Sequence, residues 1–173
     1  MSRALTSHTD WQLKHAPEPV LPEGGGSSPL LGKNAPDFKL PMLYKEQEFA
    51  LSETKGKVVV LDFWATWCGP CTMLMPENLR VAGEFGAEKV CFIAVNQAED
   101  KAAVKRFIEQ RGWKLDVVMD AQQQISRKYL VEALPHLVVI DPKGQVSWVA
   151  VGAASSHAEK LREAITKALS VKP

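Results

Sequence analysis

The sequence predicts an α/β fold with a central mixed β-sheet flanked by helices. Short strand patterns alternate with helical patterns along most of the chain, and the last two strands are joined by the tight turn Pro142-Lys143-Gly144 before a final helix. Alternating strands and helices are typical of a sheet covered by helices, and a short turn produces an antiparallel hairpin. The 173 residues, 46% of them hydrophobic and 24% charged, fit one domain with a sizeable core.

Seven strands are expected, most of them short apolar runs bounded by turn residues. Residues 37–40 and 48–51 form an N-terminal β extension around a polar turn at 44–47. The run Val58–Trp64 is apolar throughout apart from Asp62, a pattern typical of a buried strand. The remaining strands are expected at 90–95, 117–119, 137–141 and 145–151.

Four helices are expected between and after these strands. The best defined is Lys101–Arg111, because its apolar residues have helical spacing and Gly112 follows it. Helical spacing also favours core packing for Met73 and Met75 in the first helix. The other three helices are expected at 70–85, with a kink at Pro76, at 122–130, and from a cap at Ser155 or Ser156 to residue 169.

Residues 1–29 differ in composition from the rest of the chain. Four prolines flank the run Gly24-Gly25-Gly26-Ser27-Ser28, and few large apolar residues lie between them. Such a segment is expected to be a flexible linker or a disordered lead, and it lacks the apolar stretch of a secretory signal peptide. The predicted organisation is therefore a lead at 1–29 and one domain at 30–173.

The formal net charge is +1, and Lys and Arg are scattered along the chain. Nucleic-acid partners are usually bound by clustered basic residues, so no such partner is expected. A membrane-spanning helix needs roughly 18 consecutive apolar residues, and the longest apolar runs here have only the length of a strand. We expect a monomer without a membrane span.

Three cysteines are present, two of them in the motif Cys68-Gly69-Pro70-Cys71. A structural disulfide framework would use an even number at wide spacings, and a zinc site of four cysteines is impossible. A mixed zinc site would need histidines from distant parts of the chain, so no metal and no cofactor are expected. Cys91 lies in an apolar strand, where a role as a small buried hydrophobe is favoured over a redox role.

The Cys-Gly-Pro-Cys motif stands where the strand Val58–Trp64 passes into a helix. Free backbone N–H groups and the helix dipole stabilise a thiolate at such a position, and C-x-x-C thiols there have pKa values of about 3.5–7.5. Pro70 suits the first turn because its missing N–H is not needed there. Cys68 is therefore predicted to attack disulfides and Cys71, one turn further in, to resolve the mixed disulfide. The alternatives are two incidental cysteines or half of a metal site, which the strand-to-helix junction and the two bordering tryptophans disfavour.

The segment from Asp62 to Cys71 resembles the active-site segment of thioredoxins, and the wider chain resembles the TlpA/ResA-type branch of the redoxin (AhpC/TSA-related) family. The resemblance covers residues 30–169 and implies a thioredoxin fold with an N-terminal β extension. The motifs that carry the second likeness are Gly32-Lys33-Asn34-Ala35-Pro36-Asp37-Phe38, Lys55-Gly56-Lys57-Val58-Val59-Val60 and Leu134-Pro135-His136-Leu137-Val138-Val139-Ile140-Asp141.

This resemblance implies a substrate-binding surface around the disulfide. Pro135 is similar to the family's cis-proline, and the backbone of Leu134 is expected to pair with bound substrate as a short added strand. Trp67, Gly69 and Pro70 are expected to shape the same surface. The alternative for Pro135 is an ordinary trans proline at the start of a strand.

Two titratable residues near the motif each have two interpretations. An acid inside an apolar strand is costly unless it stays protonated or finds partners. The thioredoxin resemblance implies that Asp62 accepts the proton of Cys71, and the alternative is an edge or strand-end Asp bonded to backbone or water. His136, after the cis-proline, is interpreted as a surface or core histidine in preference to an imidazole that tunes the disulfide.

Together these features predict a protein disulfide reductase that works through a mixed disulfide on Cys68. The implied partners are disulfide-bearing proteins and an upstream dithiol electron donor. The family resemblance implies the bacterial envelope or periplasm, with the cytoplasm as the alternative. A thiol peroxidase of peroxiredoxin type is disfavoured because the chain lacks the Thr and Pro that peroxiredoxins place upstream of a single peroxidatic cysteine. A redox or docking module of a larger envelope protein is the third possibility, and the intact cysteine pair argues against a purely docking role.

Overall fold

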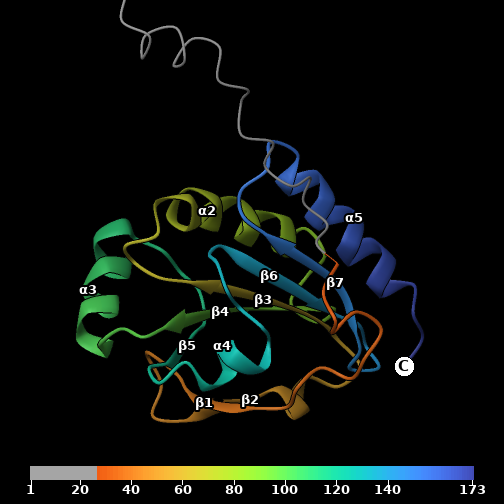
Figure 1. The fold of residues 1–173 in the computed structure, drawn as a ribbon, viewed down its shortest axis with the longest axis horizontal. Helices are drawn as coiled ribbons and strands as arrows, with labels where there is room; N and C mark the ends of the chain where they lie inside the picture. Colours follow the sequence, from red (N-terminus) through yellow and green to blue (C-terminus); the bar gives the residue numbers. More distant parts are fainter. Residues whose placement is uncertain (1–26) are drawn as a thin grey trace, which may run out of the picture.

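A five-stranded mixed sheet forms the centre of the protein, with helices on both faces (Figure 1). The structure, a computed structural model, describes residues 27–173. From one edge to the other, the strands are β5 (Val117–Asp120), β4 (Val90–Gln97), β3 (Val58–Trp64), β6 (His136–Ile140) and β7 (Val146–Val151).

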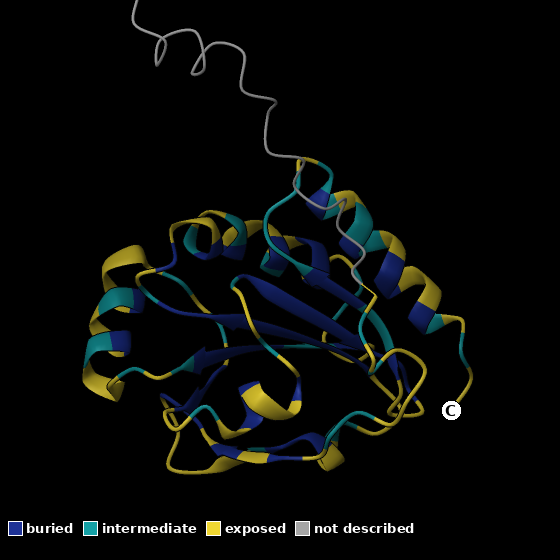
Figure 2. Cartoon of the chain, in the orientation of Figure 1, coloured by how far each residue is buried: buried dark blue, intermediate teal, exposed yellow. Residues whose placement is uncertain are grey.

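The central strand β3 pairs in parallel with β4 and antiparallel with β6. β4 and β5 are parallel, and β6 and β7 form the predicted antiparallel hairpin. Because β3 has a neighbour on each side and helices over the sheet, all of its residues are buried (Figure 2). The mixed sheet and the thioredoxin fold expected from the sequence are confirmed.

Two layers cover the sheet. Helices α2 (Gly69–Gly83), α3 (Lys101–Arg111) and α5 (His157–Leu169) cover one face, where α2 and α5 also pack on each other. The other face carries α4 (Gln124–Lys128) and the β extension (Figure 1). That extension consists of β1 (Lys39–Pro41), β2 (Glu48–Ala50) and the short 3-10 helix η1 (Leu51–Thr54).

The bounds of the predicted elements all lie within two residues of those observed, and α4 is the element that is shorter than predicted at both ends. The sequence predicted a helix over 122–130, whereas α4 spans Gln124–Lys128. Gln123 and Leu130 have left-handed backbone, with φ of 56° and 57°, and an α-helix cannot include such residues. Asp120 caps the helix from the preceding strand, because its carboxylate accepts the backbone N–H of Ser126 at 2.7 Å.

Two burial predictions are wrong. Met73 is 80% exposed although Met75 is buried, because residues two apart on a helix lie on nearly opposite sides. Cys91 is only half-buried. It precedes Ala94, where the pairing of β4 with β5 begins, so the start of β4 has no strand on that side.

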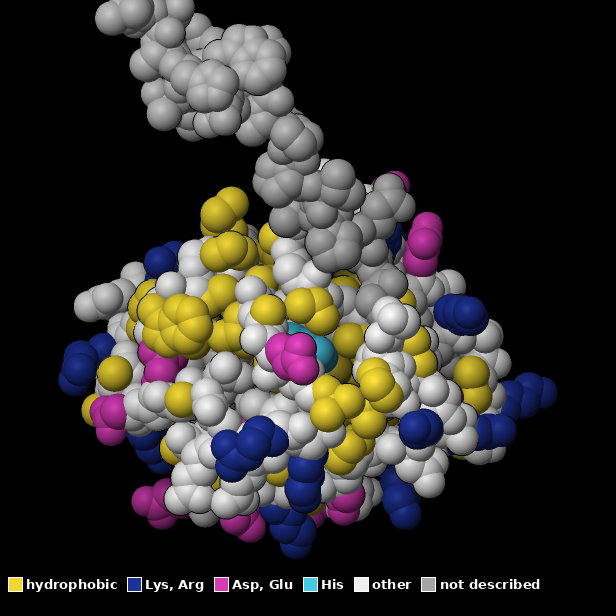
Figure 3. All heavy atoms as spheres, viewed as in Figure 1, with side chains coloured by type: hydrophobic (Ala, Val, Ile, Leu, Met, Phe, Trp, Pro, Cys, Tyr) yellow, Lys and Arg dark blue, Asp and Glu magenta, His cyan; other side chains and the backbone are white. Residues whose placement is uncertain are grey.

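The remaining sequence predictions concern the chain ends, the membrane and the surface charge. The predicted lead at 1–29 lies almost wholly outside the described residues, which begin at Ser27. Ser156 stands before the first residue of α5, as one of two predicted caps, but its side chain makes no capping hydrogen bond. Within residues 27–173, no helix has the length and apolar character needed to cross a membrane. Charged side chains of both signs are interspersed on the face in Figure 3.

Candidate active site

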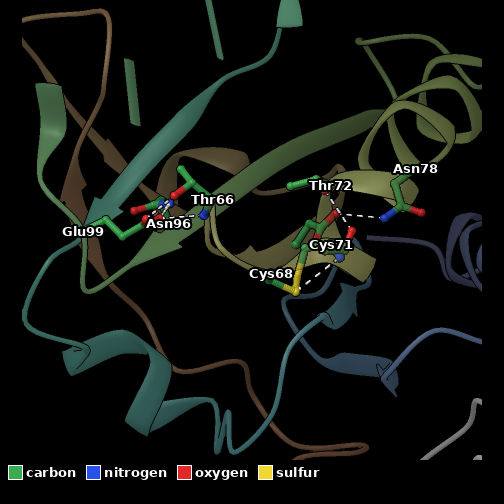
Figure 4. Close-up of a disulfide and its surroundings, with 9 residues drawn as sticks. Thr66, Cys68, Cys71, Thr72, Asn78, Asn96 and Glu99 are labelled. Carbon is green, nitrogen blue, oxygen red and sulfur yellow. Dashed lines mark hydrogen bonds between the residues drawn. A yellow bond between two sulfur atoms is a disulfide. The ribbon is translucent and has the colours of Figure 1, made fainter. Parts of the chain in front are cut away.

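Cys68 and Cys71 form a disulfide at the start of α2, directly after the end of β3 (Figure 4). Their Cα atoms are 5.3 Å apart. Cys68 is the N-cap residue of α2, and its Sγ accepts the backbone N–H of Cys71 at 3.3 Å. That N–H is one of the unpaired donors of the helix start, so it favours negative charge on Cys68 once the disulfide is reduced.

The two sulfur-bearing side chains differ in their access to solvent. Cys68 is 5% exposed and Cys71 is 1% exposed, so Cys68 lies nearer the surface. Trp67 beside it is 72% exposed, and Gly69 and Pro70 are exposed as well. This arrangement brings all three residues predicted to shape the substrate surface to the solvent side of the disulfide.

The loop before β6 completes this surface. The Leu134–Pro135 peptide bond is cis, as predicted. Leu134 packs against the apolar cluster that contains both Cys68 and Cys71. The carbonyl of Pro135 accepts the backbone N–H of Gly152 at 2.9 Å, which fixes the loop against the end of β7. Residues more than 60 positions apart in the sequence therefore meet at the disulfide.

Asp62 is buried in the middle of the central strand, between Ala94 on β4 and Leu137 on β6. The alternative of an edge or strand-end Asp is therefore wrong. Its Oδ2 accepts a hydrogen bond from Asn78 Nδ2 at 2.9 Å, and its Oδ1 has no partner among residues 27–173. Burial raises the pKa of Asp62 to about 7, and the hydrogen bond from Asn78 opposes this rise. A carboxyl group with that pKa can gain or lose a proton near neutral pH.

Sequence reasoning missed the two residues behind Asp62. Asn78 is buried on α2, and its Oδ1 lies 2.9 Å from Nε2 of the buried His157, the first residue of α5. The sequence did contain an indication for Asn78, because Asn78 is the one polar residue among the otherwise apolar positions of α2 that face the sheet. His157 gave no such signal, because nothing local shows that α5 begins beside α2.

Glu99 was missed as well, and it braces the loop that precedes Cys68. Its Oε2 accepts the backbone N–H of Thr66 at 2.8 Å and Nδ2 of Asn96 at 2.7 Å, and the Thr66 hydroxyl also donates to Glu99 (Figure 4). Glu99 lies just before α3, so one carboxylate ties the active-site loop to the end of β4.

Comparison with known proteins agrees with this geometry. Residues 31–149 match the model of the AhpC/TSA family. The chain belongs to the AhpC/TSA family. It is 38% identical over 122 residues to the thiol–disulfide oxidoreductase ResA of Geobacillus kaustophilus, covering 70% of each chain. It is 37% identical over 121 residues to the ResA of Bacillus subtilis, covering 70% of this chain and 67% of that one.

A solved structure supports the same placement within the AhpC/TSA family. A crystal structure assigned to the thiol:disulfide interchange protein DsbE of Chlorobium tepidum superposes with a TM-score of 0.73 at 33% identity. The match covers 85% of this chain and 98% of that one. The relatives and the paired cysteines at the start of α2 make this AhpC/TSA member a thiol–disulfide oxidoreductase.

His136 lies in the core on the other face of the sheet. It pairs with Phe63 across the strands, and the two rings meet edge to face with centroids 5.8 Å apart. Neither ring nitrogen has a hydrogen-bond partner among the described residues. Burial lowers the pKa of His136 to about 4. The geometry favours the core-histidine interpretation.

Proposed function

We propose that the protein is a protein disulfide reductase, with Cys68 as nucleophile and Cys71 as resolving cysteine. The observation that carries this proposal is the placement of Cys68 at the N-cap of α2, where the N–H of Cys71 points at its sulfur. In the reduced protein, the Cys68 thiolate attacks a substrate disulfide, forms a mixed disulfide and releases one substrate thiol. Cys71 then attacks Cys68 Sγ, the second substrate thiol leaves, and the enzyme disulfide is formed.

The second step needs a base, and we assign Asp62 to it. Cys71 is more buried than Cys68, so its thiol must lose a proton while shielded from water. Asp62 is buried below α2, and its pKa of about 7 suits a general base at neutral pH. Cys71 gives up its S–H proton as the new S–S bond forms, and the carboxylate takes it up.

Substrate proteins are proposed to dock across the surface formed by the exposed Trp67, Gly69 and Pro70, beside the half-buried Leu134 and the buried Pro135. The backbone of Leu134, beside the cis bond, is proposed as the edge to which an extended substrate segment adds as a strand. Trp67, at 72% exposure, offers an apolar surface next to the disulfide. Several such contacts would hold a substrate disulfide in line with Cys68.

The motif supports a proposed direction of electron flow, from the protein to substrate disulfides. The same Cys-Gly-Pro-Cys sequence in thioredoxin accompanies a reduction potential of about −270 mV, against about −120 mV for a strongly oxidising relative of that fold. We therefore propose a reductase that is recycled by an upstream dithiol donor. Its proposed place is outside the cytoplasm, since it resembles ResA and DsbE proteins, and its proposed state is a monomer.

Insulin reduction with a dithiol donor tests this function, with peroxide consumption measured in parallel. The wild-type protein is expected to reduce insulin and to consume peroxide only slowly. Cys68→Ser should abolish insulin reduction, and Cys71→Ser should accumulate mixed disulfides with substrate proteins. Cys91→Ser, which keeps the motif intact, is the matched control.

Two results would contradict the proposal. Peroxide consumption faster than insulin reduction would indicate a thiol peroxidase. Faster alkylation of Cys71 than of Cys68 in the reduced protein at pH 7 would reverse the two cysteine roles.

A further inference from the structure

Three buried polar side chains form a continuous hydrogen-bonded chain from β3 through α2 to α5. Asn78 Nδ2 lies 2.9 Å from Asp62 Oδ2, and Asn78 Oδ1 lies 2.9 Å from His157 Nε2. All three residues are buried, with 1% exposure for Asp62 and Asn78 and 4% for His157. Buried polar groups of this kind are costly unless they satisfy one another.

The donors and acceptors in this chain are fixed by chemistry. An ionised carboxylate can only accept, so Asp62 requires the N–H of the Asn78 amide. The amide oxygen is then left for His157, and an oxygen can only accept, so Nε2 of His157 must carry the hydrogen. One oxygen of Asp62 is engaged in this way, and Oδ1 remains free to take a proton.

Asn78 shares a face of α2 with Cys71. The buried residues Cys71, Met75, Asn78 and Ala82 follow the spacing of one helix face, which lies against the sheet. Two turns, or about 10 Å of helix rise, separate Cys71 from Asn78. Asp62, which is bonded to Asn78, therefore lies below the helix face that carries the resolving cysteine.

We propose that Asn78 and His157 are positioning residues for proton transfer from Cys71 to Asp62. This inference rests on the proposed function. Asn78 holds Oδ2 so that Oδ1 is the oxygen that receives the proton, and His157 holds the Asn78 amide in the orientation that donates to Asp62. In the resolving step the S–H bond of Cys71 breaks and an O–H bond forms at Oδ1, directly or through one water. The sulfur electron pair goes to Cys68 Sγ, and the substrate sulfur leaves as a thiolate.

Among the described residues, few charged groups lie around the hydrogen-bonded side chains of Asp62, Asn78 and His157. Its neighbours on β4 and β6 are Ala94 and Leu137, which carry no charge. Burial lowers the pKa of His157, and the Glu77 carboxylate on α2 opposes that shift. His136 lies on the other face of the sheet and packs on Phe63. The proton affinity of Asp62 thus depends on burial and on the single donor that Asn78 supplies.

The test is an NMR titration of the Asp62 carboxyl carbon in the oxidised protein, where Cys68 and Cys71 do not titrate. Asp62→Asn assigns the signal. Asn78→Leu keeps the side-chain size but removes the donor, and the pKa of Asp62 is expected to rise by about one unit or more. His157→Leu is expected to shift it in the same direction by less, because Asn78 remains but loses its anchor. His157→Gln, which keeps an N–H at a similar reach, should restore the wild-type value.

Val81→Ala is the matched control, since it removes buried volume from the same helix without changing the hydrogen bonds that link Asp62, Asn78 and His157. It should lower stability and leave the Asp62 titration unchanged. An unchanged Asp62 titration in folded Asn78→Leu or His157→Leu overturns the proposal, as does His157→Gln behaving like His157→Leu. If Asn78→Leu does not fold, the two His157 variants decide. If the wild-type protein does not reduce insulin, the proposed function is wrong. The titration of Asp62 does not depend on that result.

Discussion

Asp62 and His136 are two buried titratable residues on adjacent central strands, and they lie on opposite faces of the same sheet. Asp62 faces α2 and α5, whereas His136 faces Phe63 and the layer that contains α4. Burial drives both toward the neutral form, raising the pKa of Asp62 to about 7 and lowering that of His136 to about 4.

The two residues also differ in their hydrogen-bond partners. Asp62 has a donor in Asn78, which stabilises its charged form, while His136 has no partner among residues 27–173. Burial, which the Asn78 donor opposes, brings the pKa of Asp62 to about 7, so Asp62 changes charge near neutral pH while His136 stays neutral there. Burial sets the direction of each shift, and only the group whose pKa ends near neutral can exchange a proton at a working pH.

The two residues should also affect stability with opposite signs. The unfolded pKa is about 3.9 for Asp and about 6.5 for His. Between pH 4 and 7 the folded protein binds the Asp62 proton more tightly than the unfolded chain does, so this contribution to stability falls as pH rises. Between pH 6.5 and 4 the unfolded chain binds the His136 proton more tightly, so that contribution rises with pH. In the wild-type protein the two slopes partly cancel.

The largest effect is expected from Asp62→Asn. Above pH 7 it removes a buried charge, and the free energy of unfolding should increase by up to about 4 kcal/mol. Disulfide exchange near pH 7 should slow by about tenfold or more, because the general base is lost, and the deficit should shrink at higher pH as hydroxide replaces it. Urea unfolding from pH 4.5 to 8 and stopped-flow exchange rates over the same range measure both.

Asp120→Asn provides the control for this variant. Asp120 is also buried in a strand of the sheet, but its carboxylate accepts hydrogen bonds from Ile125 and Ser126. Its replacement should therefore destabilise the protein. Exchange by Asp62→Asn at the wild-type rate over the whole pH range would make Asp62 a structural residue.

The second-largest effect on stability is expected from His136→Phe. The wild-type contribution of this residue falls by about 3 kcal/mol as pH decreases from 6.5 to 4, and the variant should lose that dependence. Its stability should then fall with rising pH, under the remaining influence of Asp62. Activity and reduction potential should not change. Urea unfolding at pH 4.5 and 7, with a glutathione redox titration, checks these expectations.

A double variant sharpens the same comparison. Asp62 and His136 lie on opposite faces and share no partner, so the stability changes in Asp62→Asn/His136→Phe should add to within about 0.5 kcal/mol. A changed reduction potential in His136→Phe would show that the imidazole acts on the disulfide after all.

The smallest effect is expected from Cys91→Ala. Cys91 is half-buried on β4, and burial raises the pKa of its thiol, so it stays a neutral, unreactive side chain. Stability should fall by about 1 kcal/mol without a new pH dependence, and activity should not change. Loss of turnover with normal unfolding would instead reveal a third redox cysteine.

The sequence predicted the parts of the site that are contiguous. Cys68, Cys71 and Asp62 lie within ten residues, and their placement follows from one strand running into one helix. The cis bond at Pro135 followed from the family resemblance. The core around them followed from apolar periodicity, which fails only where coverage is uneven, as at Met73 and Cys91.

The contacts that the supporting residues make could not be predicted, and the reason is physical. Asn78, Glu99 and His157 act through side-chain contacts between elements, and such contacts depend on how helices seat on the sheet. Nothing in the periodicity of α5 shows that its first residue meets Asn78. Likewise, the contact between Glu99 and Thr66 depends on where the chain turns after β4.

The order of strands has a consequence for folding and local opening. β3, α2 and β4 follow one another along the chain, so the cysteine pair is held by elements close in sequence, whereas β6 and α5 return from far away. Segments that are distant in sequence lose more conformational entropy when they close onto the sheet, and they tend to dock later. A molecule in which β6, β7 and α5 have opened would keep its reactive cysteines but lack both Leu134 and His157. The proposed docking surface beside the disulfide therefore depends on β6 returning to pair with β3.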